Sequence, residues 1–313
     1  MRVQLIAIGG SAMHNMALAL HHKGFKVTGS DDTLFEPSKG RLEKYGLLPN
    51  EMGWFPQKIT TDLDAIILGM HARIDNPELK KAKELNIPIF SYPEYIFEQC
   101  KNKKRIVIGG SHGKTSITAM ILHVLQNRNI DCDYMVGAQL EGFQTMVKLS
   151  EAPIIILEGD EYLSSPIDLR PKFHLYKPHI ALLSGIAWDH INVFPTFAEY
   201  FKQFEIFIEE INPGGYLTYC SSDESLNIIS SINSEIETEA YLLPEYVIEA
   251  GKTIISHKAG TTELEIFGQH NLLNMNGALN VCKQLGVEES DFYKSMESFK
   301  GASKRLEKIF ERD

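Results

Sequence analysis

The most constraining feature of the sequence is a glycine-rich loop between an apolar strand and an amphipathic helix. The strand is predicted at 106–108, and the loop reads Gly-Gly-Ser-His-Gly-Lys-Thr-Ser over 109–116. In the helix, which runs to Gln126, one face carries the apolar residues Ile117, Met120, Ile121, Val124 and Leu125. Loop amides and a helix N-terminus that point to one place favour a bound phosphate. The segment therefore predicts an α/β domain that holds a phosphate-bearing ligand.

This loop fits the short pattern G-x-x-G-K-T, because the longer phosphate-loop pattern requires glycine where Ile108 stands. Lys114 is expected to contact the β- and γ-phosphates of a nucleotide. Thr115 is expected to reach a magnesium ion, since hard cations beside phosphates take oxygen ligands. The other predicted phosphate-binding residues of the loop are Gly110, Ser111, His112, Gly113 and Ser116. The alternative is a glycine turn with an incidental surface lysine.

An acidic loop follows the apolar strand predicted at 154–157. It places Glu158, Asp160 and Glu161 at the carboxyl end of the strand, the edge at which open sheets bind ligands. One or more of these carboxylates can ligate magnesium, and the pattern leaves open which one does. A solvated acidic surface is the alternative.

Two further segments carry polar side chains that suit a ligand. Trp188-Asp189-His190 comes shortly after a strand predicted at 180–183, so His190 is a candidate for metal ligation or phosphate contact, and equally for a structural histidine. A helix opening near Phe267 presents three candidates for reading a base edge, His270, Asn271 and Asn274. As helix caps these residues would need no ligand.

The N-terminal hundred residues alternate strands and helices, which predicts a mostly parallel, doubly wound sheet. A strand at 3–8 leads into Gly9-Gly10-Ser11 and a helix ending near Gly24; further strands are expected at 26–28, 65–68 and 88–90, and a helix starts at Asn76-Pro77. The first turn is a weak relative of G-x-G-x-x-G, with Asp31 about 20 residues on. It suits a nucleotide diphosphate; nicotinamide binding and a plain turn are the alternatives.

The polar, cationic run 101–105 is interpreted as a solvated linker, although such a run can also grip phosphate. We therefore predict two domains, at 1–104 and 105–313. In the second, further strands are expected at 154–157, 180–183 and 216–220. An intervening helix carries residues assigned to the core instead of to a base-stacking platform: Phe197, Tyr200, Phe201, Phe204 and Ile208.

Composition excludes several functional classes. With 31 basic and 41 acidic residues the net charge is -10, which gives no general footprint for nucleic acid. The four cysteines lack C-x-x-C spacing, which argues against structural zinc and indicates reduced thiols in a cytoplasmic protein. No stretch approaches the roughly 18 apolar residues of a membrane-spanning helix, and the start lacks a secretory leader.

Taken together, the motifs resemble the muramate (Mur) ligase family, in the branch that adds alanine or a murein tripeptide. The resemblance covers the whole chain. The residues that carry it are Ile8-Gly-Gly-Ser11, Gly29-Ser-Asp31, Asp75-Asn-Pro-Glu78, Gly110-Ser-His-Gly-Lys-Thr115, Glu158-Gly-Asp-Glu161, Asp189-His190, Gly268-Gln-His-Asn271 and Lys304-Arg305. It implies an N-terminal Rossmann-like domain that binds a UDP-sugar and a central P-loop domain that binds ATP.

The resemblance also implies a reaction and roles. ATP phosphorylates the lactyl carboxylate of UDP-N-acetylmuramate to an acyl phosphate, which an incoming amine displaces. Lys114, His190 and Arg305 are implied as catalytic residues. Thr115 and Glu158 are implied to bind one magnesium and His190 a second, with His270, Asn271 and Asn274 by the adenine. The residues assigned to the UDP-sugar are Gly9, Gly10, Ser11, Ser30, Asp31 and His71.

Within the branch, Glu158-Gly-Asp-Glu-Tyr162 resembles the tripeptide ligases more than the alanine ligases, so the tripeptide is the expected amine and L-alanine the alternative. No lysine stands at the position that several relatives carbamylate, where Glu205 is close. The family's third domain has no counterpart before Asp313, so we expect a truncated chain that turns over poorly or not at all. The rivals are a folylpolyglutamate or cyanophycin type of ligase, a non-catalytic nucleotide-sugar-binding module, and a nicotinamide oxidoreductase.

Overall fold

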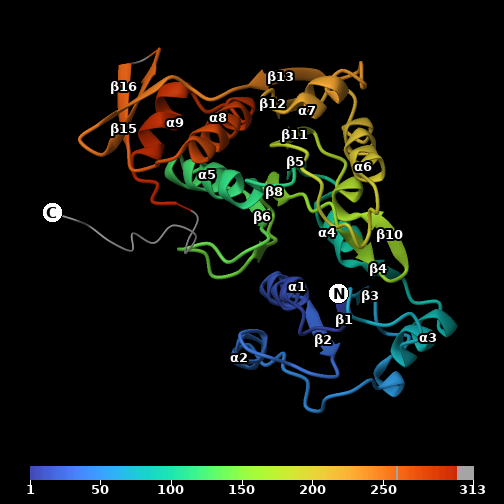
Figure 1. Cartoon of the computed structure of the whole chain (residues 1–313). Coiled ribbons are helices and arrows are strands. Elements are labelled where there is room, and N and C mark those ends of the chain that lie inside the picture. Colours follow the sequence, from blue (N-terminus) through green and yellow to red (C-terminus); the bar gives the residue numbers. More distant parts are fainter. Residues whose placement is uncertain (259, 302–313) are drawn as a thin grey trace. The chain divides into compact units, whose positions relative to one another are not determined.

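The structure is a computed structural model that describes residues 1–258 and 260–301. It separates into two compact units (Figure 1). Unit 1 comprises Met1–Asn102, Gln144–Ala152 and Tyr162–Tyr176; unit 2 comprises Lys103–Phe143, Pro153–Glu161 and the described residues from Lys177 onward. Both are built from parallel sheets and helices, which confirms the predicted α/β class.

The sheet of unit 1 is parallel, in the order β2-β1-β3-β4. Its strands are β1 (Arg2–Ile6), β2 (Lys26–Ser30), β3 (Ala65–Leu68) and β4 (Ile89–Ser91). The helices are α1 (Ser11–His22), α2 (Ser38–Lys44), the 3-10 turn η1 (Pro56–Lys58), α3 (Pro77–Glu84) and α4 (Tyr92–Cys100). Unit 1 also includes β7 (Val147–Lys148), the antiparallel pair β9 (Leu163–Ser165) and β10 (Asp168–Pro171), and η2 (Lys172–Leu175).

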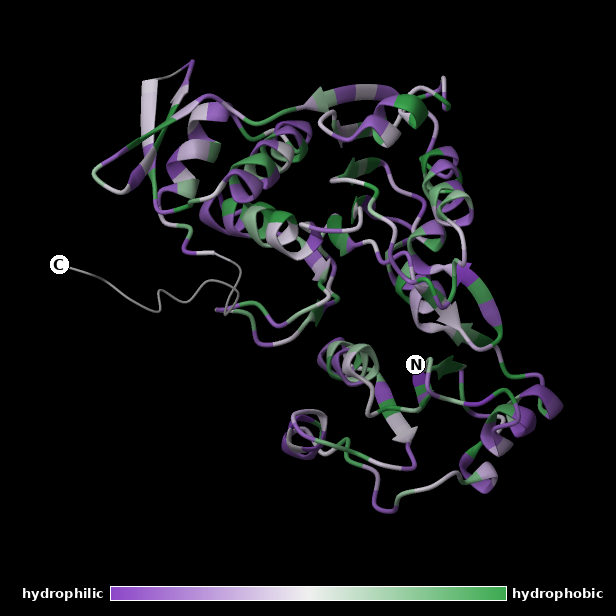
Figure 2. Ribbon diagram, viewed as in Figure 1, coloured by the Kyte–Doolittle hydropathy of each residue, from purple (hydrophilic) through white to green (hydrophobic). Residues whose placement is uncertain are grey.

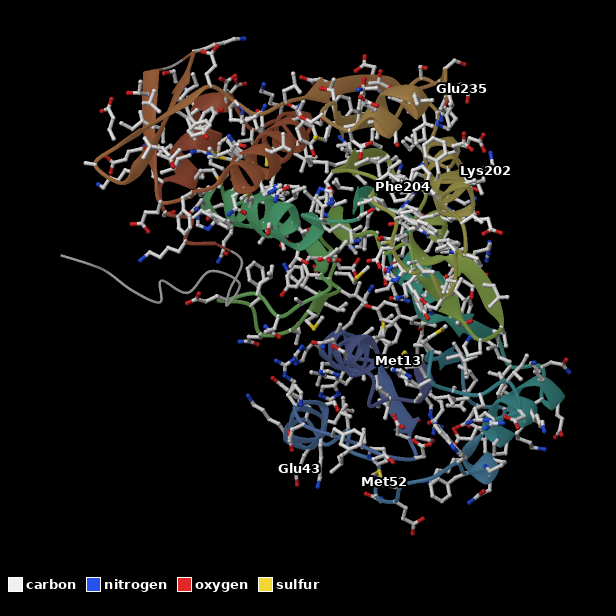
Figure 3. The ribbon with its side chains drawn as sticks, viewed as in Figure 1. Met13, Glu43, Met52, Lys202, Phe204 and Glu235 are labelled. Carbon is white, nitrogen blue, oxygen red and sulfur yellow. The ribbon has the colours of Figure 1, made fainter. Side chains whose placement is uncertain are left out.

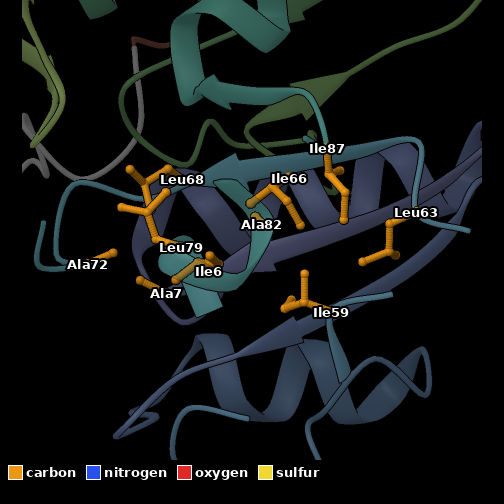
Figure 4. Packing of buried hydrophobic residues seen from close by; sticks show 10 residues of the cluster. All are labelled: Ile6, Ala7, Ile59, Leu63, Ile66, Leu68, Ala72, Leu79, Ala82 and Ile87. Carbon is orange, nitrogen blue, oxygen red and sulfur yellow. The ribbon is translucent and has the colours of Figure 1, made fainter. Parts of the chain in front are cut away.

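Local sequence explains where the helices of unit 1 begin. The Asn76 side chain accepts hydrogen bonds from the amides of Glu78 and Leu79, and Pro77 occupies the first turn, as predicted. Ser91 caps α4 through a reciprocal bond with Glu94. Apolar side chains from β1, β3, α3 and nearby loops then pack into one cluster (Figure 4): Ile6, Ala7, Ile59, Leu63, Ile66, Leu68, Ala72, Leu79, Ala82 and Ile87.

At the first glycine turn, two strands end at residues other than the predicted ones. β1 stops at Ile6, because Ala7 takes a left-handed conformation with φ of 65°. β2 continues through Gly29 to Ser30. A Cβ at Gly29 would lie 2.5 Å from Ile8 Cδ1, so glycine lets this strand pass close to the turn.

The large sheet of unit 2 places β5 and β8 beside each other, in the order β13-β12-β11-β5-β8-β6, with parallel pairing throughout these strands. The strands are β5 (Lys104–Gly109), β6 (Asp133–Met135), β8 (Ile154–Glu158), β11 (Ile180–Leu183), β12 (Tyr216–Cys220) and β13 (Glu237–Tyr241). The helices are α5 (Lys114–Asn127), α6 (Phe197–Glu209), α7 (Glu224–Ile229), α8 (Gln269–Gln284) and α9 (Glu289–Met296). A small antiparallel sheet contains β14 (Tyr246–Glu249), β15 (Lys252–His257) and β16 (Gly260–Leu264).

Hydrophobic and hydrophilic residues alternate along the helices (Figure 2). All five apolar residues predicted on one face of α5 are buried. On α6 the core prediction is right for Tyr200, Phe204 and Ile208, and wrong for Phe197, which is 41% exposed in the first turn. Among the described residues, no helix is both long and apolar enough to cross a membrane.

The cationic run 101–105 is not a solvated linker over its whole length. β5 begins within it, at Lys104. Lys103 forms an ion pair of 2.8 Å with the buried Asp133, and Arg105 is only 4% exposed. Arg105 Nε donates to the carbonyl oxygen of Lys177 at 3.0 Å, so the run is held in place by specific partners within unit 2.

Candidate active site

The glycine-rich loop joins β5 to α5, and its conformation requires glycine at two positions. Gly110 has φ of 119° and Gly113 has φ of 79°, which side-chain-bearing residues rarely adopt. A Cβ on Gly110 would lie 2.3 Å from Ser184 Oγ. Gly113 is the N-cap of α5 and brings no side chain to the helix N-terminus. The first amides of α5 are therefore not capped by the residue before them, which suits an anion.

Lys114 is the first residue of α5, and its ammonium group is held by two acceptors. Nζ donates to the carbonyl oxygen of Gly110 at 2.6 Å and to Glu161 Oε2 at 2.8 Å. The Glu161 side chain is 1% exposed, and that of Lys114 is 15% exposed. A buried charge pair of this kind needs hydrogen bonds on both partners, and the loop supplies one of them.

Thr115 and Glu158, both predicted magnesium ligands, lie together. Thr115 Oγ1 donates to Glu158 Oε1 at 2.9 Å, and the amide of Gly137 donates to Glu158 Oε2 at 2.9 Å. Burial raises the pKa of the Glu158 carboxyl, while the bonds from Gly137 and Thr115 oppose that rise. The pair offers two oxygen donors at the N-terminus of α5, beside the loop.

These residues fit a magnesium ion that is shared with phosphates. Magnesium is usually held by one or two protein oxygens together with substrate phosphates and water, not by a cage of side chains. Within residues 1–258 and 260–301, no group of three or more His, Cys, Asp or Glu residues is arranged to hold a metal. Thr115 and Glu158 would supply the protein oxygens of such a site, and phosphates and water would complete it.

His190 lies beside Glu161. Its Nε2 atom is 3.8 Å from Glu161 Oε1, and its backbone has φ of 55°. Asp189 Oδ1 accepts a hydrogen bond of 2.6 Å from the His190 amide.

On α6, Lys202 is exposed and pairs with Glu205 at 2.9 Å, whereas Phe204 is fully buried (Figure 3).

The N-terminus of α8 brings one of three predicted base-reading residues to the loop. Asn274 Oδ1 lies 2.5 Å from the position that a Cβ on Gly113 would take. The capping alternative is wrong, because the N-cap is Gly268, and Asn271 Nδ2 instead donates to the carbonyl oxygen of Phe267 at 3.0 Å. His270 is exposed. The loop residue His112 is also exposed, and its ring lies near Gly185, where a Cβ would be 2.8 Å from His112 Cε1.

In unit 1, the first glycine turn and Asp31 form one local structure. The amide of Gly9 donates to Asp31 Oδ2 at 2.7 Å. Burial raises the pKa of the Asp31 carboxyl, and the bond from Gly9 opposes that rise. His71 lies close by, because a Cβ on Gly10 would be 3.8 Å from its Cδ2 atom. Ser11 opens α1 at the same turn.

Ser30 is placed differently from its predicted partners. Its side chain is buried, and its hydroxyl donates to Glu78 Oε1 at 2.6 Å while accepting from Gln4 Nε2 at 2.7 Å. Glu78 Oε1 also accepts from the amide of Phe55 at 2.7 Å. The hydroxyl thus serves an internal network around Glu78, and is not directed at the open turn.

Sequence reasoning missed two side chains that organise these sites. One is Glu78, which was noticed only as part of a motif. The other is Tyr200, which was assigned to the core by helical spacing alone, although its hydroxyl contacts both Ser111 and Glu161. A hydroxyl in an otherwise apolar stripe was the available signal. Arg305 lies outside the described residues.

Comparison with known proteins decides the family. Residues 2–104 match the Mur ligase family, catalytic domain, and residues 108–282 match the Mur ligase middle domain. The chain belongs to the Mur ligase family. This confirms the resemblance drawn from the motifs, and members of the family are ATP-dependent ligases.

Among curated Mur ligases, the UDP-N-acetylmuramate--L-alanine ligase of Clostridium kluyveri is 31% identical over 98% of this chain and 68% of that protein. The UDP-N-acetylmuramate--L-alanyl-gamma-D-glutamyl-meso-2,6-diaminoheptandioate ligase of Haemophilus influenzae is 25% identical over 97% of this chain and 69% of that protein. The chain thus has relatives of both specificities.

Solved structures show the same fold. A murein tripeptide ligase from Neisseria meningitides superposes with a TM-score of 0.86 at 22% identity, covering 97% of this chain and 99% of the other. The UDP-N-acetylmuramate-alanine ligase of Thermotoga maritima gives 0.75 at 21% identity, covering 100% of this chain and 71% of the other. At these identities the likeness concerns the fold.

Proposed function

We propose that this Mur ligase activates the carboxylate of UDP-N-acetylmuramate with ATP, through an acyl phosphate, for attack by an amine, as a cytoplasmic step of peptidoglycan synthesis or recycling. Residues 1–104 bind the nucleotide sugar, and those from 105 on bind ATP. The observation that carries the proposal is the arrangement at the loop: Lys114 held by Gly110 and Glu161, with Thr115 bonded to Glu158.

Each group has a definite task in this reaction. Phosphoryl transfer needs positioning and charge neutralisation more than a covalent protein group. The loop amides and the N-terminus of α5 bind the phosphates, and Lys114 places a positive charge beside the β- and γ-phosphates. Thr115 and Glu158 would hold a magnesium ion, which neutralises phosphate charge when bound. His190, beside Glu161, is the candidate for contact with a second ion.

The nucleotide sugar is assigned to the first glycine turn of unit 1. Gly9, Gly10 and Ser11 open α1, where backbone amides suit a diphosphate. Asp31 is fixed by the Gly9 amide, and His71 lies beside Gly10. Ser30 contributes through its bond to Glu78, which holds the end of β2 in place.

Two amines are candidates, and a different observation favours each. L-alanine is favoured by the name of the Clostridium kluyveri relative, at 31% identity. The tripeptide L-alanyl-γ-D-glutamyl-meso-diaminopimelate is favoured by the loop Glu158-Gly-Asp-Glu-Tyr162 and by the Haemophilus influenzae relative. We keep the tripeptide as the first expectation and L-alanine as the second.

The experiment offers both amines at once. The chain is placed in excess over UDP-N-acetylmuramate, with ATP, magnesium and equal amounts of L-alanine and tripeptide, so that even slow turnover leaves a product for mass spectrometry. A product with either amine supports the ligase and names its substrate. Binding of ATP and the sugar nucleotide without any product would contradict catalysis and assign a non-catalytic binding module.

A further inference from the structure

Tyr200 on α6 has a ring and a hydroxyl that do different things. The ring is fully buried, with its centroid 5.6 Å from that of Phe194 and 5.2 Å from that of Phe204. A phenylalanine would fill that space equally well. The hydroxyl lies 2.9 Å from Ser111 Oγ in the phosphate loop and 3.0 Å from Glu161 Oε1. Packing therefore accounts for the ring and leaves the hydroxyl unexplained.

The direction of these hydrogen bonds follows from the acceptor at one end. An ionised carboxylate only accepts, so the Tyr200 hydroxyl donates to Glu161. Its oxygen then accepts from the Ser111 hydroxyl, which in turn accepts from the amide of Ala187 at 2.8 Å. Burial, with the nearby Glu161 charge, raises the pKa of Tyr200, which keeps the phenol a neutral donor.

The other oxygen of Glu161 connects this series of hydrogen bonds to the phosphate loop again. Glu161 Oε2 accepts from Lys114 Nζ at 2.8 Å, and Nζ also donates to the Gly110 carbonyl. An ammonium group has three N–H donors, so these two acceptors fix its orientation and leave a third donor for a phosphate. The series Ser111, Tyr200, Glu161, Lys114 thus starts and ends in the same loop.

We propose that Tyr200 is a positioning residue of the ATP site, which acts through Glu161 to aim the Lys114 ammonium at the phosphates. The inference rests on the proposed function and deepens it. Without the phenol, Glu161 Oε1 has lost a neutral donor in a site where its side chain is 1% exposed. The carboxylate must then find other donors, of which His190 Nε2 is 3.8 Å away, and Lys114 moves with it.

The experiment is a double-mutant cycle with equilibrium binding as the readout. Dissociation constants for the non-hydrolysable analogue AMP-PNP, with magnesium, are measured by calorimetry for the unsubstituted chain, Tyr200→Phe, Lys114→Ala and the double variant. Loss of a hydrogen bond to a charged group predicts about tenfold weaker binding for Tyr200→Phe. In the Lys114→Ala background the same substitution should cost less than about twofold, because the group it positions is gone.

A matched control is available in the same unit. Tyr241 is buried, and within the described chain its hydroxyl has no hydrogen-bond partner. Tyr241→Phe removes the same atom and should leave AMP-PNP affinity unchanged. If Tyr200→Phe does not fold, Glu161→Gln replaces it in the cycle, since the neutral amide keeps the volume and loses the charge that holds Lys114.

The outcomes separate the inference from the function on which it rests. Equal AMP-PNP affinity in the unsubstituted chain and Tyr200→Phe would overturn the inference alone. An equal loss from Tyr200→Phe with and without Lys114 would also overturn it, because a general loosening of the site acts in both backgrounds. No binding by the unsubstituted chain would overturn the proposed function and the inference together.

Discussion

Removal of the Glu78 side chain should strongly lower the free energy of unfolding of unit 1. It is completely buried in the first turn of α3, and no lysine or arginine pairs with it among the contacts described. Oε1 accepts from the Ser30 hydroxyl at 2.6 Å and the Phe55 amide at 2.7 Å, and Oε2 from Gln4 Nε2 at 3.4 Å. Its carboxylate therefore joins β1, β2 and the loop before η1.

The magnitude follows from these bonds. A hydrogen bond to a charged group contributes roughly 1.5–3 kcal/mol, so loss of the two short ones in Glu78→Ala should cost about 3–6 kcal/mol of the free energy of unfolding. That is a large part of the roughly 5–15 kcal/mol of a typical domain. Glu78→Gln keeps a carbonyl oxygen for both short bonds and loses the charge and the acceptor of the 3.4 Å bond from Gln4 Nε2, so we expect a smaller cost of about 1–2 kcal/mol.

The assay uses the two tryptophans, one in each unit. Trp54 packs against the apolar cluster of unit 1 and reports its unfolding once Trp188→Phe removes the signal of unit 2. Urea unfolding is compared in this background. The matched control is Glu84→Ala on the same helix, where the side chain is 64% exposed and the effect should stay within about 0.5 kcal/mol. A cost for Glu78→Ala no larger than for Glu84→Ala would show that the hydrogen bonds of the Glu78 carboxylate do not stabilise unit 1.

Four further outcomes follow from the two sites. Lys114→Ala should abolish ATP-dependent acyl phosphate formation, measured by trapping with hydroxylamine, while UDP-sugar affinity stays unchanged. Gly110→Ala should weaken AMP-PNP binding at least tenfold by calorimetry, because its Cβ would lie 2.3 Å from Ser184 Oγ. His71→Ala should raise the dissociation constant for UDP-N-acetylmuramate. An unaltered constant would show that His71 is a surface residue that does not contact the nucleotide sugar. Burial lowers the pKa of His14 below its usual 6.5, so the unfolded state takes up a proton at a higher pH than the folded state does. The free energy of unfolding of unit 1, measured with urea, should therefore fall as the pH drops below about 6.5. The fall should be smaller in His14→Gln.

Much of the fold could be predicted because the central strands are short, uninterrupted apolar runs. The strands at 65–68, 180–183 and 216–220 were predicted to the residue. The glycine-rich loop was placed between the right strand and helix, since its glycines and the stripe on α5 are local signals. Local signals of this kind do not depend on distant partners.

What could not be predicted depends on contacts between distant residues. The short strands β9 and β10 carry no long apolar run, and the segments 144–152 and 162–176 group with unit 1 although they follow the start of unit 2 in sequence. Burial of Arg105 rests on a carbonyl 72 residues away, and that of Ser30 on a carboxylate 48 residues away. Helical spacing placed the ring of Tyr200 correctly but carries no information about its hydroxyl.

Calorimetric titration of the chain with UDP-N-acetylmuramate, with UDP-N-acetylglucosamine and NADH as controls, tests whether unit 1 binds the nucleotide sugar of a Mur ligase. We expect selective binding of the muramate, because the first glycine turn, Asp31 and His71 are assigned to that nucleotide sugar. Binding of NADH with none of the muramate would contradict the assignment of unit 1 and the ligase reaction built on it.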